Sequence, residues 1–235
     1  PFKLTDGYII TKDGKEFIYY LQSNTAESFT VPNGVETISD CAFLNAVNLQ
    51  QISLPDTLTT IGGGAFYNSG LTYIELPDSV TWFGEGAFSQ APNLKTVKLG
   101  KGITSVCGGA SWGCQFVYLD IPDWITSIGN MPFYSCVKLE GFVLHKYLTS
   151  VSPTSVLFAM PFGAQLRILP TIYFRGTEAE WIEMMQKGIL REELFIDHGR
   201  QMPIYFYSEE EPTDTEGLYW HYDENGNPVI WEIEK

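Results

Sequence analysis

The apolar and polar positions of residues 31 to 151 follow one pattern that repeats every 22 or 23 residues. Most copies open with Leu-Pro-Asp or a close variant, as in LPDSVTWFGEGAFSQAPNLKTVK at 76–98. The apolar side chains of one such turn cannot be buried within that turn, so the turns must stack and share a continuous core. The pattern therefore predicts a solenoid of about six turns, the last of which loses the pattern after Val151. The copies start at Val31, Leu54, Leu76, Leu99, Ile121 and Leu144.

Each copy contains one short segment in which apolar and polar residues alternate. In the copy that starts at Leu76 this segment reads Leu94-x-x-Val97-x-Leu99, the strand signature of a leucine-rich repeat. Alternation with a period of two is typical of a strand with one buried face. Strands at the same place in successive turns pair side by side, about 4.8 Å apart. The repeat therefore predicts a mainly β solenoid with a parallel sheet, and the intervening residues of each strand point outward.

The N-terminal segment predicts a β-hairpin. Two apolar runs in GYIITKDGKEFIYY, at 7–20, are joined by Asp13-Gly14, which is typical of a tight hairpin turn. A repeat array exposes its last hydrophobic layer unless another element covers it. We therefore expect an N-terminal hairpin cap at 1–30, repeats at 31–170 and a C-terminal cap at 171–235.

The C-terminal region predicts an α+β cap. A strand at 171–174 precedes a helix over about 177–189, which should begin at a capping box of Thr177 and Glu180. A second strand is expected at 203–207, and a terminal hairpin around Asn225-Gly226. The apolar face of the helix is predicted to consist of Ala179, Ile182, Met185 and Ile189.

The repeat resembles the BspA-like leucine-rich repeat, with the pattern L-P-x-x-V-T-x-I-G-x-G-A-F-x-x-C-x-x-L-x-x-V over residues 31 to about 150. It departs from that pattern at Ser111, where Phe is expected, and at Pro132, where Ala is expected. The C-terminal region is similar to the module that follows such repeats in clostridial proteins. The resemblance implies a right-handed leucine-rich-repeat solenoid. It also implies a secreted or cell-surface protein of a host-associated anaerobic bacterium.

The charge of the chain argues against nucleic acid as a partner. The formal net charge is −14, so a phosphate backbone would be repelled. The acidic run at 209–211 is best interpreted as a solvated face, because no Ca²⁺-loop spacing accompanies it. No run of about 18 apolar residues is present, so we expect no membrane insertion of this segment. We expect any signal peptide and anchor to lie outside the printed sequence.

The titratable residues do not form a recognisable catalytic or metal motif. His145, His198 and His221 have no ligand spacing such as HExxH, and GxSxG and CxxC are both missing. We therefore predict a protein that is not an enzyme and that binds no metal or cofactor. Cys114 and Cys136 fall at the same repeat position, so they should stack on adjacent turns. Their parallel side chains favour free thiols, and a disulfide remains the alternative.

The outward strand positions carry any recognition. Two columns run along the predicted sheet, and Trp82 and Trp124 stand where other copies have small residues, as Trp112 does in the aberrant fourth turn. Large exposed aromatics can stack on sugars or anchor a protein, although they also pack over neighbouring loops. The candidate binding residues are Gln51, Ser53, Tyr73, Glu75, Trp82, Thr96, Lys98, Tyr118, Asp120 and Trp124.

Three functions are compatible with these features. The first is a cell-surface or secreted scaffold that binds a protein, as in adhesion to host matrix. The second is a carbohydrate-binding module that uses the outward aromatics, and the third is a structural spacer of a larger surface protein. The choice of the first rests on analogy with the family, because a fold does not fix a function.

Overall fold

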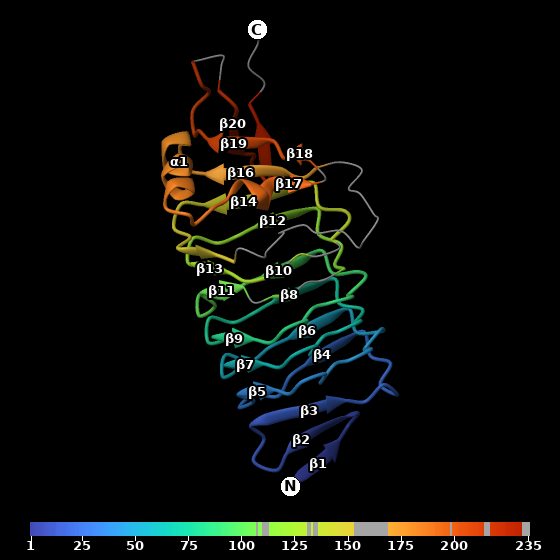
Figure 1. Cartoon of the computed structure of the whole chain (residues 1–235). Coiled ribbons are helices and arrows are strands. Elements are labelled where there is room, and N and C mark those ends of the chain that lie inside the picture. Colours follow the sequence, from blue (N-terminus) through green and yellow to red (C-terminus); the bar gives the residue numbers. More distant parts are fainter. Residues whose placement is uncertain are drawn as a thin grey trace.

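The chain forms an elongated coil with its termini at opposite ends (Figure 1). The computed structural model describes residues 1–106, 108–109, 113–130, 133, 136–152, 169–197, 199–213 and 217–231. The coil is mainly β, its turns are joined by parallel strand pairs, and one α-helix lies near the C-terminal end of the described chain. These features confirm the predicted leucine-rich-repeat fold at this level of detail.

An antiparallel hairpin opens the coil and continues into its sheet. Gly14 occupies the left-handed region at a φ of 78°, which the tight turn requires. The last hairpin strand, β3, pairs in parallel with the first strand of the repeats, β5. Phe17 of β3 stacks on Phe43 of the first repeat with ring centroids 4.7 Å apart, so the hairpin shares the repeat core. The strands are β1 (Phe2–Thr5), β2 (Tyr8–Thr11), β3 (Glu16–Tyr20) and β5 (Thr37–Ile38).

Successive turns build two ladders of short strands on different sides of the coil (Figure 1). In the first ladder β5 pairs with β7 and β7 with β9, at register offsets of 23 and 22 residues. In the second ladder β4 pairs with β6, and β8 pairs with β10. A backbone hydrogen bond links the two pairs, because the amide of Thr72, just before β8, donates to the carbonyl of Gln50, just before β6, 3.1 Å away. The strands are β4 (Ser28–Thr30), β6 (Gln51–Ser53), β7 (Thr60–Ile61), β8 (Tyr73–Glu75), β9 (Trp82–Phe83) and β10 (Thr96–Lys98).

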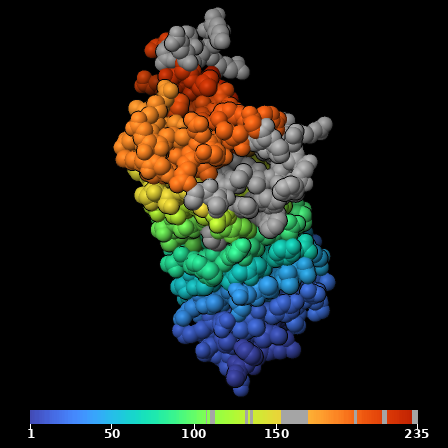
Figure 2. All heavy atoms as spheres, in the orientation of Figure 1, coloured from blue at the N-terminus to red at the C-terminus, as the bar shows by residue number. Residues whose placement is uncertain are grey.

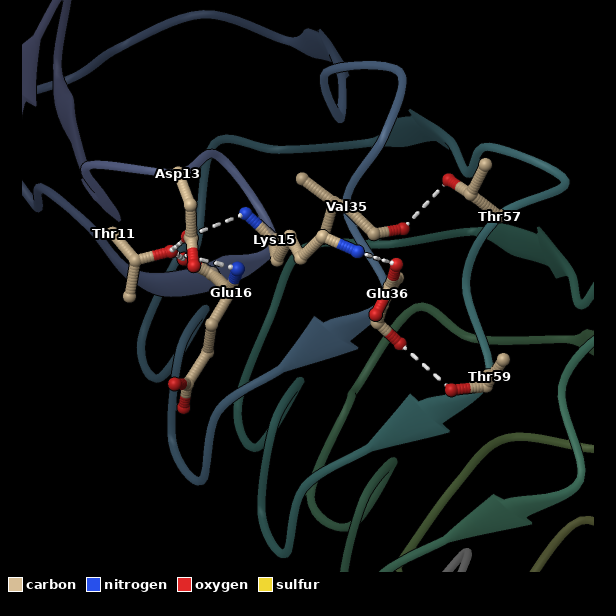
Figure 3. A network of polar contacts seen from close by, with 8 residues as sticks. All are labelled: Thr11, Asp13, Lys15, Glu16, Val35, Glu36, Thr57 and Thr59. Carbon is tan, nitrogen blue, oxygen red and sulfur yellow. Dashed lines mark hydrogen bonds and ion pairs between the residues drawn. The ribbon is translucent and has the colours of Figure 1, made fainter.

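Polar side chains tie the first turns together beside the first ladder (Figure 3). Lys15 of the hairpin forms an ion pair with Glu36. The hydroxyl of Thr57 donates to the carbonyl of Val35, 2.7 Å away, and that of Thr59 donates to the carbonyl of Glu36, 3.0 Å away. The threonine side chains of one turn thus donate hydrogen bonds to the backbone of the preceding turn, in addition to the apolar contacts between the two turns.

The coil contains a break between the third and fourth turns. Strand β9 is not hydrogen-bonded to β11, and β10 is not hydrogen-bonded to β12. The amide of Thr81 donates to the carbonyl of Thr59, and that of Thr126 to the carbonyl of Thr104. No equivalent bond joins Thr104 to Thr81, although both residues are described. Beyond the break the ladders resume through β11 (Ser105–Val106), β12 (Tyr118–Asp120), β13 (Ser127–Ile128), β14 (Gly141–His145) and β15 (Ser150–Val151).

The C-terminal region extends the second ladder. Strand β14 pairs in parallel with β16, β16 with β19 and β19 with β20, and only the last strand, β21, is antiparallel. This region and its helix form the broader end of the molecule (Figure 2). The elements are β16 (Thr171–Arg175), α1 (Glu178–Gln186), the 3₁₀-helix η1 (Glu192–Phe195), β17 (Ile196–Asp197), β18 (Arg200–Gln201), β19 (Ile204–Tyr207), β20 (Tyr219–Tyr222) and β21 (Pro228–Ile230).

Helix α1 starts as predicted, but its end and its buried face differ from the prediction. Thr177 and Glu180 form the reciprocal capping box. The helix ends at Gln186, because Gly188 takes a left-handed φ of 68° and closes the last turn. The residues that α1 buries are Trp181 and Met184, while Ile182 is 46% exposed. The predicted apolar face is therefore wrong for Ala179 and Ile182, whereas Met185 and Ile189 are partly buried against the core. The indole of Trp181 packs between Phe174 and Phe195, and this aromatic contact sets the rotation of the helix.

Candidate functional site

Eight of the ten candidate residues lie on the outward side of the second ladder. They alternate along β6, β8, β10 and β12 with residues that point into the core, and all eight are exposed. The prediction that these positions point outward is therefore confirmed, whereas their role in binding is untested. We call this surface the outer face; it consists of Gln51, Ser53, Tyr73, Glu75, Thr96, Lys98, Tyr118 and Asp120.

A polar cluster occupies the middle of the outer face. The ammonium of Lys98 lies 2.5 Å from a carboxylate oxygen of Glu75, across the β8–β10 pair. The hydroxyl of Tyr73 donates to the other oxygen of Glu75 at 3.0 Å. The hydrogen bond from Lys98, aided by that from Tyr73, lowers the pKa of Glu75. Tyr73 is 43% exposed, so its ring stays accessible while its hydroxyl is held in one direction.

The two candidate tryptophans do not share one surface. Trp82 belongs to β9 of the first ladder, where it is 52% exposed. Trp124 follows β12 and donates its indole N–H to the carbonyl of Gly100, 3.2 Å away. Trp124 therefore lies beside the outer face, near Tyr118, and Trp82 belongs to a different strand ladder. Trp112 is outside the described residues.

The outer face is covered where the C-terminal region begins. Gly141 and Val143 continue its two columns but are buried. Val143, Tyr173 and Trp220 form a second apolar cluster on the outward side of the sheet. A Cβ added to Gly141 would lie 2.6 Å from the ring of Tyr173 and 2.7 Å from that of Tyr118. Glycine is therefore required where these two rings meet.

Asp120 is held by the C-terminal region. Arg175 approaches one carboxylate oxygen of Asp120 at 2.6 Å, and the hydroxyl of Tyr222 donates to the other at 2.7 Å. Burial raises the pKa of Asp120 even though Arg175 and Tyr222 favour its charged form. Burial also raises the pKa of Tyr222, and the charge of Asp120 adds to this effect. Sequence reasoning missed this clamp, since no local pattern links three residues so far apart.

A cavity of about 550 Å³ opens at the break, between the facing edges of β10 and β12. Its inner wall is apolar and includes Phe83, Phe88, Val106, Phe116 and Phe133. Its rim lies at the outer face and includes Tyr73, Lys98, Tyr118, Asp120 and Trp124. Six of the ten candidate residues line this cavity; the other four are Gln51, Ser53, Glu75 and Trp82.

Phenylalanines at one repeat position line the cavity from both sides of the break. Phe43, Phe66 and Phe88 stack in successive turns, with centroids 5.2 and 5.8 Å apart. Phe133 occupies the same repeat position two turns beyond Phe88, but the intervening copy has Ser111. A protein interior leaves few voids when its side chains match in size. The departure at Ser111 is therefore the sequence signal that was available for this region, although Ser111 itself lies outside the described residues.

The cysteines that stack on adjacent turns are buried thiols. The thiol of Cys114 lies 3.0 Å from the carbonyl of Phe88, and both Cys114 and Cys136 are buried. Burial raises the pKa of the Cys114 thiol and raises that of Cys136 to about 12. Thiols with such pKa values are poor nucleophiles at neutral pH. These residues therefore serve the core, and they offer no reactive centre.

Histidines and carboxylates do not converge in the described ranges. His145 is buried, burial lowers its pKa, and its Nδ1 accepts the amide N–H of Tyr147 at 3.1 Å. His221 stacks on Trp231 with centroids 3.9 Å apart, and His198 lies outside the described residues. No group of three His, Cys, Asp or Glu within the described residues could hold a metal ion. Among the helices that the structure describes, none is long and apolar enough to cross a membrane.

Two solved structures share this architecture. The pneumococcal vaccine antigen PcpA aligns with 88% of this chain and 43% of its own, at a TM-score of 0.53 and 19% identity. A leucine-rich repeat protein from Eubacterium ventriosum aligns over 67% of this chain and 47% of its own, at a TM-score of 0.54 and 23% identity. At these identities the likeness shows the fold alone. This chain spans less than half the length of either protein.

The family is established by the repeats themselves. No curated protein matches this chain. Residues 16–152 match the BspA type leucine rich repeat region in six copies. This match covers more than half of the 235 residues, so the chain belongs to the BspA-type leucine-rich-repeat family.

Proposed function

We propose that this protein is a non-catalytic scaffold that binds a protein ligand through the outer face. The observation that carries the proposal is the exposure of eight alternating residues on four stacked strands, with two tyrosines among them. Side chains on paired strands are held in a fixed spacing, so they present a preorganised surface that loses little entropy on binding. Tyrosine adds a large and rigid contact area, which is typical of binding hot spots.

The same proposal includes the location and the ends of the chain. BspA-type proteins often act at the cell surface, and we infer a secreted or surface-attached protein that adheres to host matrix. The hairpin over β2 and β3 and the region after β16 would then act as caps, because they cover the apolar layers at the two ends. Packing of Phe17 on Phe43 and of Trp181 on Phe174 supports this role.

Carbohydrate binding is the second candidate. Tyr73, Tyr118 and Trp124 all line the rim of the cavity, so three aromatic residues gather where a sugar ring could stack. Trp82 does not line the cavity and is not expected to contribute. A structural spacer is the third candidate, and it would bind neither class of ligand.

A binding screen distinguishes these candidates. The purified chain would be tested on host matrix proteins by surface plasmon resonance and on a glycan array. We expect a matrix protein to bind, and Tyr73→Ala with Tyr118→Ala to weaken that binding at least tenfold. The control is Tyr67→Ala, because Tyr67 is similarly exposed, at 40%, but belongs to neither ladder. Equal losses in the control, glycan binding alone, or no binding at all would each contradict the proposal.

A further inference from the structure

The cavity at the break is bridged at both ends of the gap between β10 and β12. At one end the amide of Gln115 donates to the carbonyl of Leu94 at 3.2 Å. At the other end the indole N–H of Trp124 donates to the carbonyl of Gly100 at 3.2 Å. Strands β10 and β12, which lie between these two bonds, line the cavity along their whole length. The cavity is therefore a pocket of limited length, which suits a small molecule.

The interior of this pocket is apolar and largely aromatic. Phe83 and Phe88 line it from the turns before the break, and Phe116 and Phe133 line it from the turns after the break. Aromatic rings favour edge-to-face or offset contacts with another ring. The volume of about 550 Å³ lies within the range of about 300–1,000 Å³ that is typical of small-molecule sites. The interior therefore fits an apolar body that contains an aromatic ring.

One cation of the pocket has no acidic partner. Lys98 is paired with Glu75, and Arg175 is paired with two aspartates. Lys95 also lines the pocket and is exposed, and its ammonium forms no ion pair with any residue that the structure describes. A ligand carboxylate could pair with this ammonium, and a hydrogen bond between two charged groups is stronger than one between neutral groups. The charges of the lining therefore favour a ligand with one carboxylate.

We propose that this pocket binds a small carboxylic acid, whose aromatic body lies against the phenylalanines and whose carboxylate pairs with Lys95. The inference goes beyond the proposed function, because it requires no contact between the outer face and a protein. Burial of the apolar body supplies most of the binding free energy, whereas an exposed ion pair adds little. The pairing with Lys95 therefore acts mainly on the orientation of the ligand and on the choice of an acid over a neutral analogue.

The test compares phenylbutyrate with its neutral analogue phenylbutanol by isothermal titration calorimetry on the full chain. We expect one molecule of either compound to bind per chain. Lys95→Gln should weaken binding of the acid about threefold, as for one exposed ion pair, and should leave the alcohol unchanged. At about 1 M salt, where the Debye length is about 3 Å, this difference should disappear. The matched control is Lys101→Gln, since Lys101 is exposed but does not line the pocket.

A second variant tests the apolar interior. Leu119 lines the pocket and is partly buried, so Leu119→Phe should occupy its space and weaken binding of both compounds at least tenfold. Its control is Ile52→Phe, since Ile52 is the partly buried inward residue of β6 and does not line the pocket. Circular dichroism would check that both variants fold, and the Lys95→Gln comparison decides if Leu119→Phe does not. Binding of neither compound to the unmodified chain, equal weakening of acid and alcohol by Lys95→Gln, or unchanged binding to folded Leu119→Phe would each overturn the inference.

Discussion

Asp120 shows how a residue on a binding surface can be fixed by a distant part of the chain. Its carboxylate lies between Arg175 and Tyr222, which belong to β16 and β20 of the C-terminal region. The clamp joins the repeats to that region at the rim of the cavity. Asp120 therefore stabilises the fold as well as contributing to the outer face, and its exposure alone would not reveal this.

Tyr222→Phe should weaken that clamp. The variant removes the hydroxyl that donates to Asp120, which leaves the carboxylate with Arg175 as its side-chain partner. We expect the free energy of unfolding to fall by about 1 kcal/mol in urea titrations at pH 7, as for one lost hydrogen bond. Tyr67→Phe serves as the control, since its side chain is exposed on the return path. A loss below about 0.3 kcal/mol would show that the hydroxyl bond contributes no net stability.

Gly141→Ala should displace the rings of Tyr118 and Tyr173, which both lie close to Gly141. The new Cβ would lie within 3 Å of both rings, so at least one ring must move. Overpacking of this kind costs about 1–3 kcal/mol, which thermal unfolding would detect. Thr96→Ala, at the equivalent position of β10, is exposed and should change stability by less than about 0.5 kcal/mol. Similar effects of the two substitutions would contradict the steric explanation.

At the scale of elements, the strands were easier to predict than the helix. Each strand from β6 to β14 in the second ladder repeats an alternation that is visible in five copies, so its position and its outward side follow from the sequence, whereas the two-residue strands of the first ladder were not predicted. Helix α1 occurs only once, so no second copy helps to identify its buried face. Two overlapping sets of apolar residues recur at helical spacing, one that includes Ile182 and one that includes Trp181 and Met184. Trp181 decides between them, because burying an indole against Phe174 and Phe195 stabilises the fold more than burying Ile182. The capping box located the start of the helix, and Gly188 could have located its end.

The capping box also predicts a dependence of stability on pH. The pKa of Glu180 is lowered by its ion pair with Lys146 and by the hydrogen bond from the amide of Thr177. Its contribution is therefore fully present above its usual pKa of 4.5 and is lost as the pH falls through the lower folded pKa. We expect Glu180→Gln to cost about 0.5–1 kcal/mol at pH 7, because glutamine keeps part of the cap. Urea titrations should show that this difference narrows below pH 4.5.

At the scale of the molecule, the break divides the coil into two stacks of turns. The amide of Gln115 donates to the carbonyl of Leu94 across the break, but no described strands pair there. In a repeat protein each turn is stabilised by its neighbours, so a junction without strand pairing lowers the cooperativity between the two sides. The sequence could indicate this junction through Ser111, but it could not show that both ladders separate at the same level. That outcome depends on packing around the cavity, where side chains from β9, β10, β11 and β12 come together.

Hydrogen exchange would test the two-stack description. The amides of Thr81 and Thr126 donate to carbonyls one turn earlier, whereas the amide of Thr104 has no such bond to Thr81. The three residues occupy the same repeat position and are all exposed, so they form a matched set. We expect the amide of Thr104 to exchange at least tenfold faster, as measured by two-dimensional NMR. Equal protection of the three amides would mean that the coil opens as one cooperative unit.

The constant register of the first ladder has a consequence for how such proteins change length. Strands β5, β7 and β9 repeat the same pairing at offsets of 23 and 22 residues. An in-frame duplication of the turn that contains β5, residues 31–53, would therefore insert a self-similar layer and lengthen the coil by about 4.8 Å. The break, its cavity and the clamp on Asp120 would remain as they are, because all three lie on the C-terminal side of the duplicated turn. Recombination between copies could then vary the reach of the protein while the cavity stays constant.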